Sequence, residues 1–202
     1  MPRILFVKTS SLGDVVHQCP AVSDAARGIP EVKIDWVVED AFAGVVRMHS
    51  RVERVIPVAV RRWRTAPWRP QVWREVSAFR ASLRGERYDA VIDTQGLLKS
   101  ALITCLTSGP RHGMDRASAR EPLASRFYDH SHFVPRELHA VERNRRLTAA
   151  ALGIALPALI DYGLRGGAAP GAKPQALDSV LPASYTVLLT MTSRADLSLI
   201  HI

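Results

Sequence analysis

The sequence has no uninterrupted apolar run of about 18 residues, so it predicts no transmembrane helix. The start, MPRILFVK, has an apolar core of only four residues. That core is too short for a signal peptide and fits a first strand. Cysteine is scarce, because the chain has only Cys19 and Cys105, and their positions do not match the spacing of metal ligands. We expect both thiols to be buried and reduced in apolar helices, which favours the cytoplasm.

Glycine motifs for nucleotide binding are also missing. The turn after the first apolar run has a single glycine, Gly13, so it matches neither G-x-G-x-x-G nor G-K-[ST]. Nicotinamide and ATP enzymes built on those motifs are therefore disfavoured. No cluster of His, Asp and Cys has ligand spacing in the sequence, so we expect neither a metal nor another cofactor.

Positive charge is what the sequence has in excess, because its 202 residues carry a net charge of +8. Positions 61–87 hold eight arginines against Glu75 and Glu86. Arginine suits planar recognition of phosphate or carboxylate, so an acidic small molecule or an acidic membrane surface is a candidate partner. A solvated helix face is the plain structural alternative for the arginines after position 70. The chain lacks an aromatic stacking motif, which disfavours nucleic acid as a partner.

Strand-like and helix-like stretches alternate along the chain. The strand-like runs are rich in Val, Ile and Leu and cover Ile4–Val7, Ile34–Val38, Val55–Val60, Ala90–Ile92 and Thr186–Thr190. The helix-like stretches lie near 14–27, 40–48, 71–85, 97–107 and 138–152. Nearly continuous apolar strands are typical of a sheet that helices cover on both faces. The pattern predicts an α/β fold with a Rossmann-like, doubly wound parallel sheet over residues 1–152.

The sequence after residue 152 has a different character. Residues 153–183 contain a glycine- and alanine-rich run and show little periodicity, which predicts a linker. One more strand falls in 184–196, and we interpret it as the start of a second domain. The last residues, 197–202, read LSLIHI, and the codons CTG TCT CTT ATA CAC ATC for them resemble a transposon-end adapter used in sequencing libraries. We therefore expect this tail not to be native.

Polar residues crowd the turn KTSSLGDVV at positions 8–16, directly after the first strand. Asp14 stands where a helix begins, and a carboxylate there accepts backbone N–H bonds and suits the positive end of the helix dipole. The same place, at the carboxyl edge of a parallel sheet, also suits a general base that faces a ligand crevice. Ser10 and Ser11 would then orient a substrate. His17, one turn further on, is either a second polar contact or a packed histidine.

Several longer stretches resemble, in the right order, the ADP-heptose glycosyltransferase family, which contains the lipopolysaccharide heptosyltransferases. They are VKTSSLGDVVH (7–17), IDWVVE (34–39), VERVIPVAVRRWR (52–64), YDAVIDTQGLLKSA (88–101), HGMDRASAREPLASRFYD (112–129) and HAVERNR (139–145). The resemblance covers about residues 1–152 and resumes at YTVLLTMTSR (185–194), and the stretches VIPVAVRRWR and SAREPLAS favour the type I branch. It implies a GT-B glycosyltransferase with two Rossmann-like domains, of which this chain is the N-terminal half, truncated early in the second.

The resemblance also implies an activity. Type I members transfer L-glycero-D-manno-heptose, with inversion, from ADP-heptose to the Kdo residue of Kdo-lipid A during synthesis of the lipopolysaccharide inner core. The expected location is peripheral, on the cytoplasmic face of the inner membrane. We expect the fragment alone to be inactive, because the half that binds the donor would be missing. A non-catalytic module that binds inner-core lipopolysaccharide is the alternative.

Individual residues are assigned by the same resemblance. Asp14 would be the catalytic base, while the acceptor would be bound by Ser10, Ser11, Gly13, Arg61, Arg62, Arg64 and Arg120. Thr192 and Ser193 match a hydroxyl pair near the donor phosphates, whereas the family's following lysine falls near Leu197 here. Asp93 and Gln95 would either line the acceptor side or form a turn and helix cap.

Overall fold

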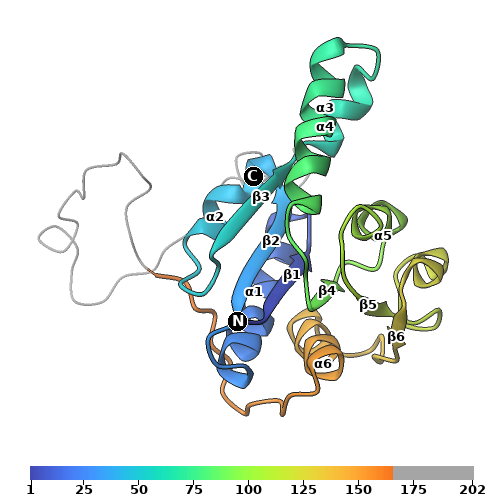
Figure 1. The fold of residues 1–202 in the computed structure, drawn as a ribbon. Helices are drawn as coiled ribbons and strands as arrows, with labels where there is room; N and C mark the ends of the chain where they lie inside the picture. Colours follow the sequence, from blue (N-terminus) through green and yellow to red (C-terminus); the bar gives the residue numbers. More distant parts are fainter. Residues whose placement is uncertain (166–202) are drawn as a thin grey trace, which may run out of the picture. The chain divides into compact units, whose positions relative to one another are not determined.

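The structure is a computed structural model, and it describes residues 1–165 of the chain. One sheet of six parallel strands has the order β3-β2-β1-β4-β5-β6 (Figure 1). The strands are β1 (Arg3–Val7), β2 (Lys33–Glu39), β3 (Arg54–Val58), β4 (Ala90–Asp93), β5 (Arg111–Met114) and β6 (His130–His132). This order, which changes direction between β1 and β4, is that of a doubly wound Rossmann-like sheet. The predicted α/β class with a parallel sheet is confirmed.

Helices cover both faces of this sheet. One face packs against α1 (Leu12–Gly28), α2 (Ala43–Arg47) and α6 (Ala140–Leu152). The other face packs against α3 (Val60–Thr65), α4 (Pro70–Arg84) and α5 (Leu98–Thr104). Two short 3-10 helices, η1 (Asp40–Phe42) and η2 (Pro122–Phe127), lie in the connections. The burial of both faces explains why the central strands are apolar at almost every position.

The first strand shows how side chains are divided between the two faces. Ile4 and Phe6 belong to the core under α1, whereas Leu5 and Val7 belong to the core under α4. Successive residues of a strand point to opposite faces, so a continuous apolar run supplies both cores at once. The run ends at Lys8, and the chain turns there into α1. The end of β1 is therefore held in place by both layers.

Several elements differ from the sequence-based expectations at the edges of the sheet. The expected strand Val55–Val60 ends at Val58, and a short helix, α3, begins at Val60. The sequence analysis did not predict β5 and β6, because these short strands contain glycine, serine and histidine rather than an apolar run. Propensity is a weak guide for such strands, since their neighbours in the sheet decide their conformation.

The segment after α6 packs against the domain over its described length. The backbone N–H of Ser50 donates to the Gly163 carbonyl at 2.9 Å, and Leu164 forms an antiparallel bridge with His49. Gly163 has a φ of 61°, and a Cβ there would lie 2.6 Å from the His49 ring, so glycine is required at this contact. The compact unit thus extends past the domain boundary expected at residue 152. The remainder of the expected linker, the strand in 184–196 and the tail 197–202 lie outside the described residues.

The two cysteines have different surroundings. Cys19 is buried in α1, and burial raises the pKa of its thiol to about 12. Cys105, at the end of α5, is exposed and its sulfur accepts a hydrogen bond from Arg111. The expectation of two buried thiols is wrong for Cys105, because the last turn of α5 leaves this side chain outside the apolar contacts. Of the helices in residues 1–165, none has the length and apolar character needed to cross a bilayer.

Three histidines lie side by side on β5 and β6. The ring centroid of His112 is 4.8 Å from that of His130 and 5.5 Å from that of His132. A hydrogen bond of 3.2 Å joins His112 Nδ1 and His132 Nε2, so one nitrogen must be protonated and the other not. Burial and the two neighbouring histidines lower the pKa of His112 to about 4.

This cluster predicts a loss of stability in mild acid. The unfolded chain binds a proton at His112 near the ordinary pKa of about 6.5, whereas the folded chain resists protonation until about pH 4. Unfolding takes up protons between these values, so stability falls as the pH drops through this window. We expect a loss of about 1–2 kcal/mol, reduced by water around the half-buried ring. Urea unfolding near neutral pH and near pH 5 measures it, and His112→Gln should flatten the pH dependence. An equally steep dependence in the variant would contradict the assignment.

Candidate active site

The candidate site lies where β1 and β4 end side by side. Val7 of β1 pairs with Asp93 of β4, so the two turns that follow, at residues 8–11 and 94–97, start next to each other. The sheet changes winding direction between these strands, and ligands of open α/β sheets bind in the crevice at such a point. The topology therefore brings together two segments that are more than 80 positions apart in sequence.

Gln95 joins the two turns. Its Oε1 accepts hydrogen bonds from the Thr9 backbone N–H at 2.7 Å and from the Thr9 hydroxyl at 2.8 Å. Its Nε2 donates to the carbonyl of Ser10 at 2.8 Å. Gln95 is buried, so these bonds are not in competition with bulk water. Gln95 therefore fixes the path of the serine turn that leads to Asp14.

Asp93 organises the second turn from within the core. It is fully buried, and its Oδ1 accepts hydrogen bonds from the backbone N–H groups of Gln95 and Gly96. Its Oδ2 accepts from the Tyr128 hydroxyl at 2.8 Å. Burial raises the pKa of Asp93, and these donors oppose the shift. Of the two interpretations left open for Asp93 and Gln95, the contacts favour the turn-forming one.

Asp14 occupies the first turn of α1. Both the backbone N–H and the hydroxyl of Ser11 donate to Asp14 Oδ2, at 2.9 and 3.1 Å. Among the hydrogen bonds of the described residues, none goes to Oδ1, and the side chain is only partly buried. One carboxylate oxygen therefore stabilises the start of the helix while the other remains open to a ligand. The helix-start and base interpretations of Asp14 are compatible with each other.

Two lysines that the sequence analysis did not select stand at this turn. Lys8 is buried, and its Nζ donates to the Thr94 carbonyl at 3.0 Å. Burial lowers the pKa of Lys8, and the negative charges of Asp14 and Asp93 oppose that shift. Lys99 of α5 donates to the Ser10 hydroxyl at 3.0 Å. A lysine directly after a buried strand was the available signal for Lys8, because a buried ammonium requires partners.

The arginines expected to bind an acceptor fall into two places. Arg120 is exposed on the loop before η2, and its charge helps to lower the pKa of Lys8, so it stands near the site. Its backbone packs on the β4 turn, where Gly96 has a φ of 65° and an added Cβ would lie 3.3 Å from the Arg120 nitrogen. Arg120 is therefore held at the rim of the site by backbone contacts.

Arg61, Arg62 and Arg64 lie on α3 at the end of β3. Two strand spacings separate β3 from β1, which places α3 roughly 10 Å from the serine turn. Glu39, at the end of β2, connects the two: its N–H donates to the Thr9 carbonyl, and its Oε1 accepts from the Arg61 backbone N–H. The three arginines share the carboxyl edge of the sheet with Asp14 without contacting it.

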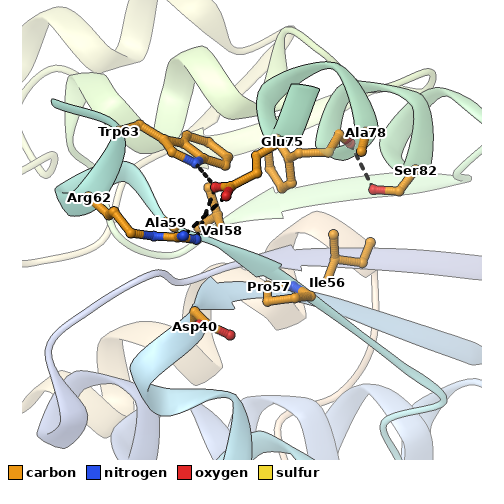
Figure 2. A pocket seen from close by; sticks show the side chains of 11 residues that line it. Asp40, Ile56, Pro57, Val58, Ala59, Arg62, Trp63, Glu75, Ala78 and Ser82 are labelled. Atoms are coloured by element: carbon orange, nitrogen blue, oxygen red, sulfur yellow. Dashed lines mark hydrogen bonds and ion pairs between the residues drawn. The ribbon is translucent and has the colours of Figure 1, made fainter. Parts of the chain in front are cut away.

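A hollow of about 330 Å³ opens between β3, η1 and α4 (Figure 2). Figure 2 shows Glu75 of α4 reaching toward Trp63 and Arg62 of α3. The Trp63 indole N–H donates to Glu75 at 2.8 Å, and this bond, ahead of the nearby Arg62 charge, lowers the pKa of Glu75. Asp14 does not line this hollow. Because Arg62 is already paired with Glu75 at 3.0 Å, it is less available to a ligand than Arg61 or Arg64.

The remaining predicted residues have simpler outcomes. Gly13 lies exposed in the first turn of α1, where an added Cβ would meet no atom within 4 Å. His17 packs edge-on against His139 with ring centroids 5.2 Å apart, which favours the packed-histidine interpretation. Thr192 and Ser193 lie outside the described residues, and their assignment to the donor stays a prediction.

The chain is similar to known glycosyltransferases in both sequence and structure. The model of glycosyltransferase family 9 (heptosyltransferase) matches residues 76–196, which is more than half of the chain, and the chain belongs to this family. Lipopolysaccharide heptosyltransferase 1 of Escherichia coli (strain K12) is 55% identical over 156 residues, or 77% of this chain and 49% of that protein. Lipopolysaccharide heptosyltransferase 1 of Pseudomonas aeruginosa is 52% identical over 193 residues, or 95% of this chain and 52% of that protein.

A solved structure supports the same relationship. "E. coli heptosyltransferase WaaC with ADP-2-deoxy-2-fluoro heptose" matches with a TM-score of 0.77 and 53% identity, covering 79% of this chain and 51% of that one. The family, the type I resemblance and the GT-B fold class expected from the motifs are confirmed. The chain spans about half the length of the curated relatives that it matches.

The hydrogen bonds of Gln95 lead to a stability prediction. Gln95→Ala would leave the buried Thr9 N–H and hydroxyl without their acceptor, and an unpaired buried polar group costs about 1–3 kcal/mol. We expect urea unfolding to show a loss of at least this size. Gln71→Ala is the matched control, because Gln71 is exposed on α4 and its hydrogen bond to Glu75 is exposed to water, so the substitution should change stability by less than about 0.5 kcal/mol. Equal effects of the two substitutions would show that Gln95 does not hold the site together.

Proposed function

We propose that this chain is the acceptor-binding half of a heptosyltransferase. The reaction is the transfer of L-glycero-D-manno-heptose, with inversion, from ADP-heptose to the Kdo residue of Kdo-lipid A in lipopolysaccharide core synthesis. The observation that carries the proposal is Asp14, a carboxylate with one open oxygen at the switch point of the sheet. Membership of glycosyltransferase family 9 and similarity to a structure described with an ADP-heptose analogue support it.

The chemistry requires a base on the acceptor side. A Kdo hydroxyl attacks the anomeric carbon of heptose, the bond from that carbon to the phosphate oxygen breaks, and ADP leaves with the electron pair. Asp14 Oδ1 takes the proton of the attacking hydroxyl, while Ser11 keeps the carboxylate oriented through Oδ2. The buried Lys8 side chain lies close enough to Asp14 for the carboxylate charge to oppose the lowering of the Lys8 pKa by burial, so the two groups attract each other at the site.

The basic residues around the site suit the proposed acceptor. Kdo carries a carboxylate and lipid A carries phosphates, and guanidinium groups bind both with charge-assisted hydrogen bonds. Arg120 at the near rim and Arg61 and Arg64 on α3 are exposed at the same edge of the sheet as Asp14. A lipid-linked acceptor also requires the protein to work at a membrane surface, so we propose a peripheral location on the cytoplasmic face of the inner membrane.

The direct test compares the chain with a completed protein, in which it is extended to its relatives' length with their C-terminal half. Mass spectrometry should detect transfer of heptose from ADP-heptose to Kdo-lipid A by the completed protein and none by residues 1–202 alone. Isothermal titration of the completed protein with ADP-heptose distinguishes the enzyme from the non-catalytic alternative. A module that only binds lipopolysaccharide would not bind the donor. Absence of both donor binding and transfer would reject the proposed enzyme.

Asp14→Asn in the completed protein tests the base. The asparagine oxygen can still accept from Ser11, so only the charge–dipole contribution of about 0.3–1 kcal/mol is lost and the fold should survive. Asparagine cannot take the acceptor proton, and losing a general base lowers the rate by about 10²–10⁴-fold. The readouts are kcat on Kdo-lipid A, thermal melting and the Kd for ADP-heptose, which should stay within a few-fold. A variant that melts normally and keeps more than about a tenth of the wild-type kcat would leave Asp14 as a helix-start residue only.

Arg61→Ala and Arg64→Ala test the acceptor side of the same protein. Each removes a guanidinium that is exposed at the carboxyl edge, and losing one charge-assisted contact costs about 1.5–3 kcal/mol. The KM for the acceptor should rise while the Kd for ADP-heptose stays unchanged. Arg84→Ala, near the far end of α4, is the matched control and should leave both constants as they are. An unchanged acceptor KM in both test variants, with folding intact, would show that these arginines do not bind the acceptor and only form a solvated helix face.

A further inference from the structure

The hairpin of α3 and α4 concentrates tryptophan as well as arginine. Residues 60–76 contain Trp63, Trp68 and Trp73, which are three of the four tryptophans in the chain. The same residues include five arginines and a single glutamate, Glu75. Figure 1 shows the two helices standing beyond the end of the sheet, where β3 leads into them. This combination of large aromatic and cationic side chains is concentrated at one projecting element of the fold.

The three indoles have different environments. Trp63 is tied into the fold, because its N–H donates to Glu75 and its ring packs edge-on against Phe79 at 5.7 Å. Trp68 and Trp73 are 75% and 65% exposed. The Glu75 carboxylate also accepts from Gln71 and Arg62, so the hairpin is braced from its interior. These hydrogen bonds of Glu75 fix the hairpin, which carries Trp68 and Trp73 with most of their ring surface exposed to solvent.

Of the two exposed indoles, Trp73 lines an apolar hollow. The side chains around it come from both helices and the turn between them, and are Val60, Trp63, Arg64, Pro67, Val72, Trp73 and Val76. Arg64 is one of these, and Arg61, Arg69 and Arg74 are exposed elsewhere on the same hairpin. Among the ion pairs in residues 1–165, only Arg62 of the hairpin arginines has a partner. An apolar surface bordered by unneutralised cations is thus exposed at the carboxyl edge of the sheet.

We propose that residues 60–76 dock the protein on a bilayer that contains anionic phospholipid, with Trp68 and Trp73 inserted at headgroup depth. Tryptophan is enriched at membrane interfaces, because its ring is apolar while its N–H can stay hydrated. Arginines around the indoles can extend their guanidinium groups to lipid phosphates while their stems cover apolar surface. The excess positive charge of the hairpin favours binding to an anionic lipid surface over binding to a neutral protein surface.

This docking would place the acceptor site at the membrane. The hairpin follows β3 at the same edge at which β1 ends, and Glu39 links the two through Thr9 and Arg61. Under the proposed function, a lipid-linked acceptor would then meet Asp14 from the bilayer side. This consequence rests on the proposed function, whereas binding to plain phospholipid depends on the hairpin alone.

Vesicle binding by the 202-residue chain tests the proposal without donor or acceptor. The probes are vesicles of phosphatidylcholine alone and of equal parts phosphatidylcholine and phosphatidylglycerol, both free of lipopolysaccharide. We expect co-sedimentation with the anionic vesicles only, a blue shift of tryptophan fluorescence on binding, and weakening by salt.

Variants with matched controls locate the surface. Trp68→Ala with Trp73→Ala should lower the partition coefficient at least about tenfold and remove the blue shift, because two apolar rings no longer enter the interface. Arg69→Gln with Arg74→Gln should lower it about twentyfold or more, at about fivefold per charge. The controls are Phe133→Ala, an aromatic that is 70% exposed beyond β6, and Arg126→Gln on η2. Neither should change binding.

Three results would overturn the proposal, provided that circular dichroism shows each variant folded. The first is failure of the wild-type chain to bind anionic vesicles. The second is equal binding by the tryptophan pair variant and by Phe133→Ala. The third is a concentration-dependent dimer, lost in the tryptophan variant, with no vesicle binding, because the occupant would then be a second copy of the chain. If vesicle binding fails while the completed protein transfers heptose to a deacylated acceptor, only the docking surface is rejected and the proposed function stands.

Discussion

The candidate site depends on the junction between the ends of β1 and β4. Gln95 accepts from Thr9 and donates to Ser10, and the Lys8 ammonium reaches the Thr94 carbonyl from the other strand. These bonds connect segments that only the parallel pairing of β1 with β4 brings together. Because they are buried, breaking any one leaves a polar group without a partner. The junction therefore acts as one unit, and the direction in which α1 leaves the sheet follows from it.

The two carboxylate oxygens of Asp14 have different roles, and this connects the β1–β4 junction to the proposed chemistry. An oxygen used for the start of α1 and an oxygen left open are what a fixed base requires, since the first holds the orientation of the second. Glu39 extends the same framework to α3, where the arginines begin. The carboxyl edge thus combines a fixed carboxylate at its centre with exposed cationic side chains at its border. Under the proposed function, the carboxylate would meet the reacting sugar of the acceptor and the cationic side chains would meet its anionic groups.

The central strands and the serine turn were predictable from sequence, because apolar runs followed by polar residues have few other solutions in an α/β chain. The sequence motifs also single out Asp14 and the arginine stretch as candidate site residues. Strands β5 and β6 were not predictable, since their pairing is imposed by Asp129, Arg111 and the neighbouring β4 rather than by composition. Lys8 and Lys99 were missed because their roles come from partners that are distant in sequence. The path of residues 153–165 along the domain was missed for the same reason.

The proposed reaction requires that Asp14 face the acceptor hydroxyl. The most direct measurement is a crystal structure of the completed protein with ADP-heptose and a deacylated Kdo acceptor, made with the Asp14→Asn variant so that the substrates persist. We expect the reacting hydroxyl to lie within hydrogen-bond distance, about 2.6–3.2 Å, of the residue-14 side chain. We also expect the acceptor's acidic groups to lie toward Arg61, Arg64 and Arg120. An acceptor bound away from the β1–β4 junction, with residue 14 contacting only Ser11, would contradict these expectations.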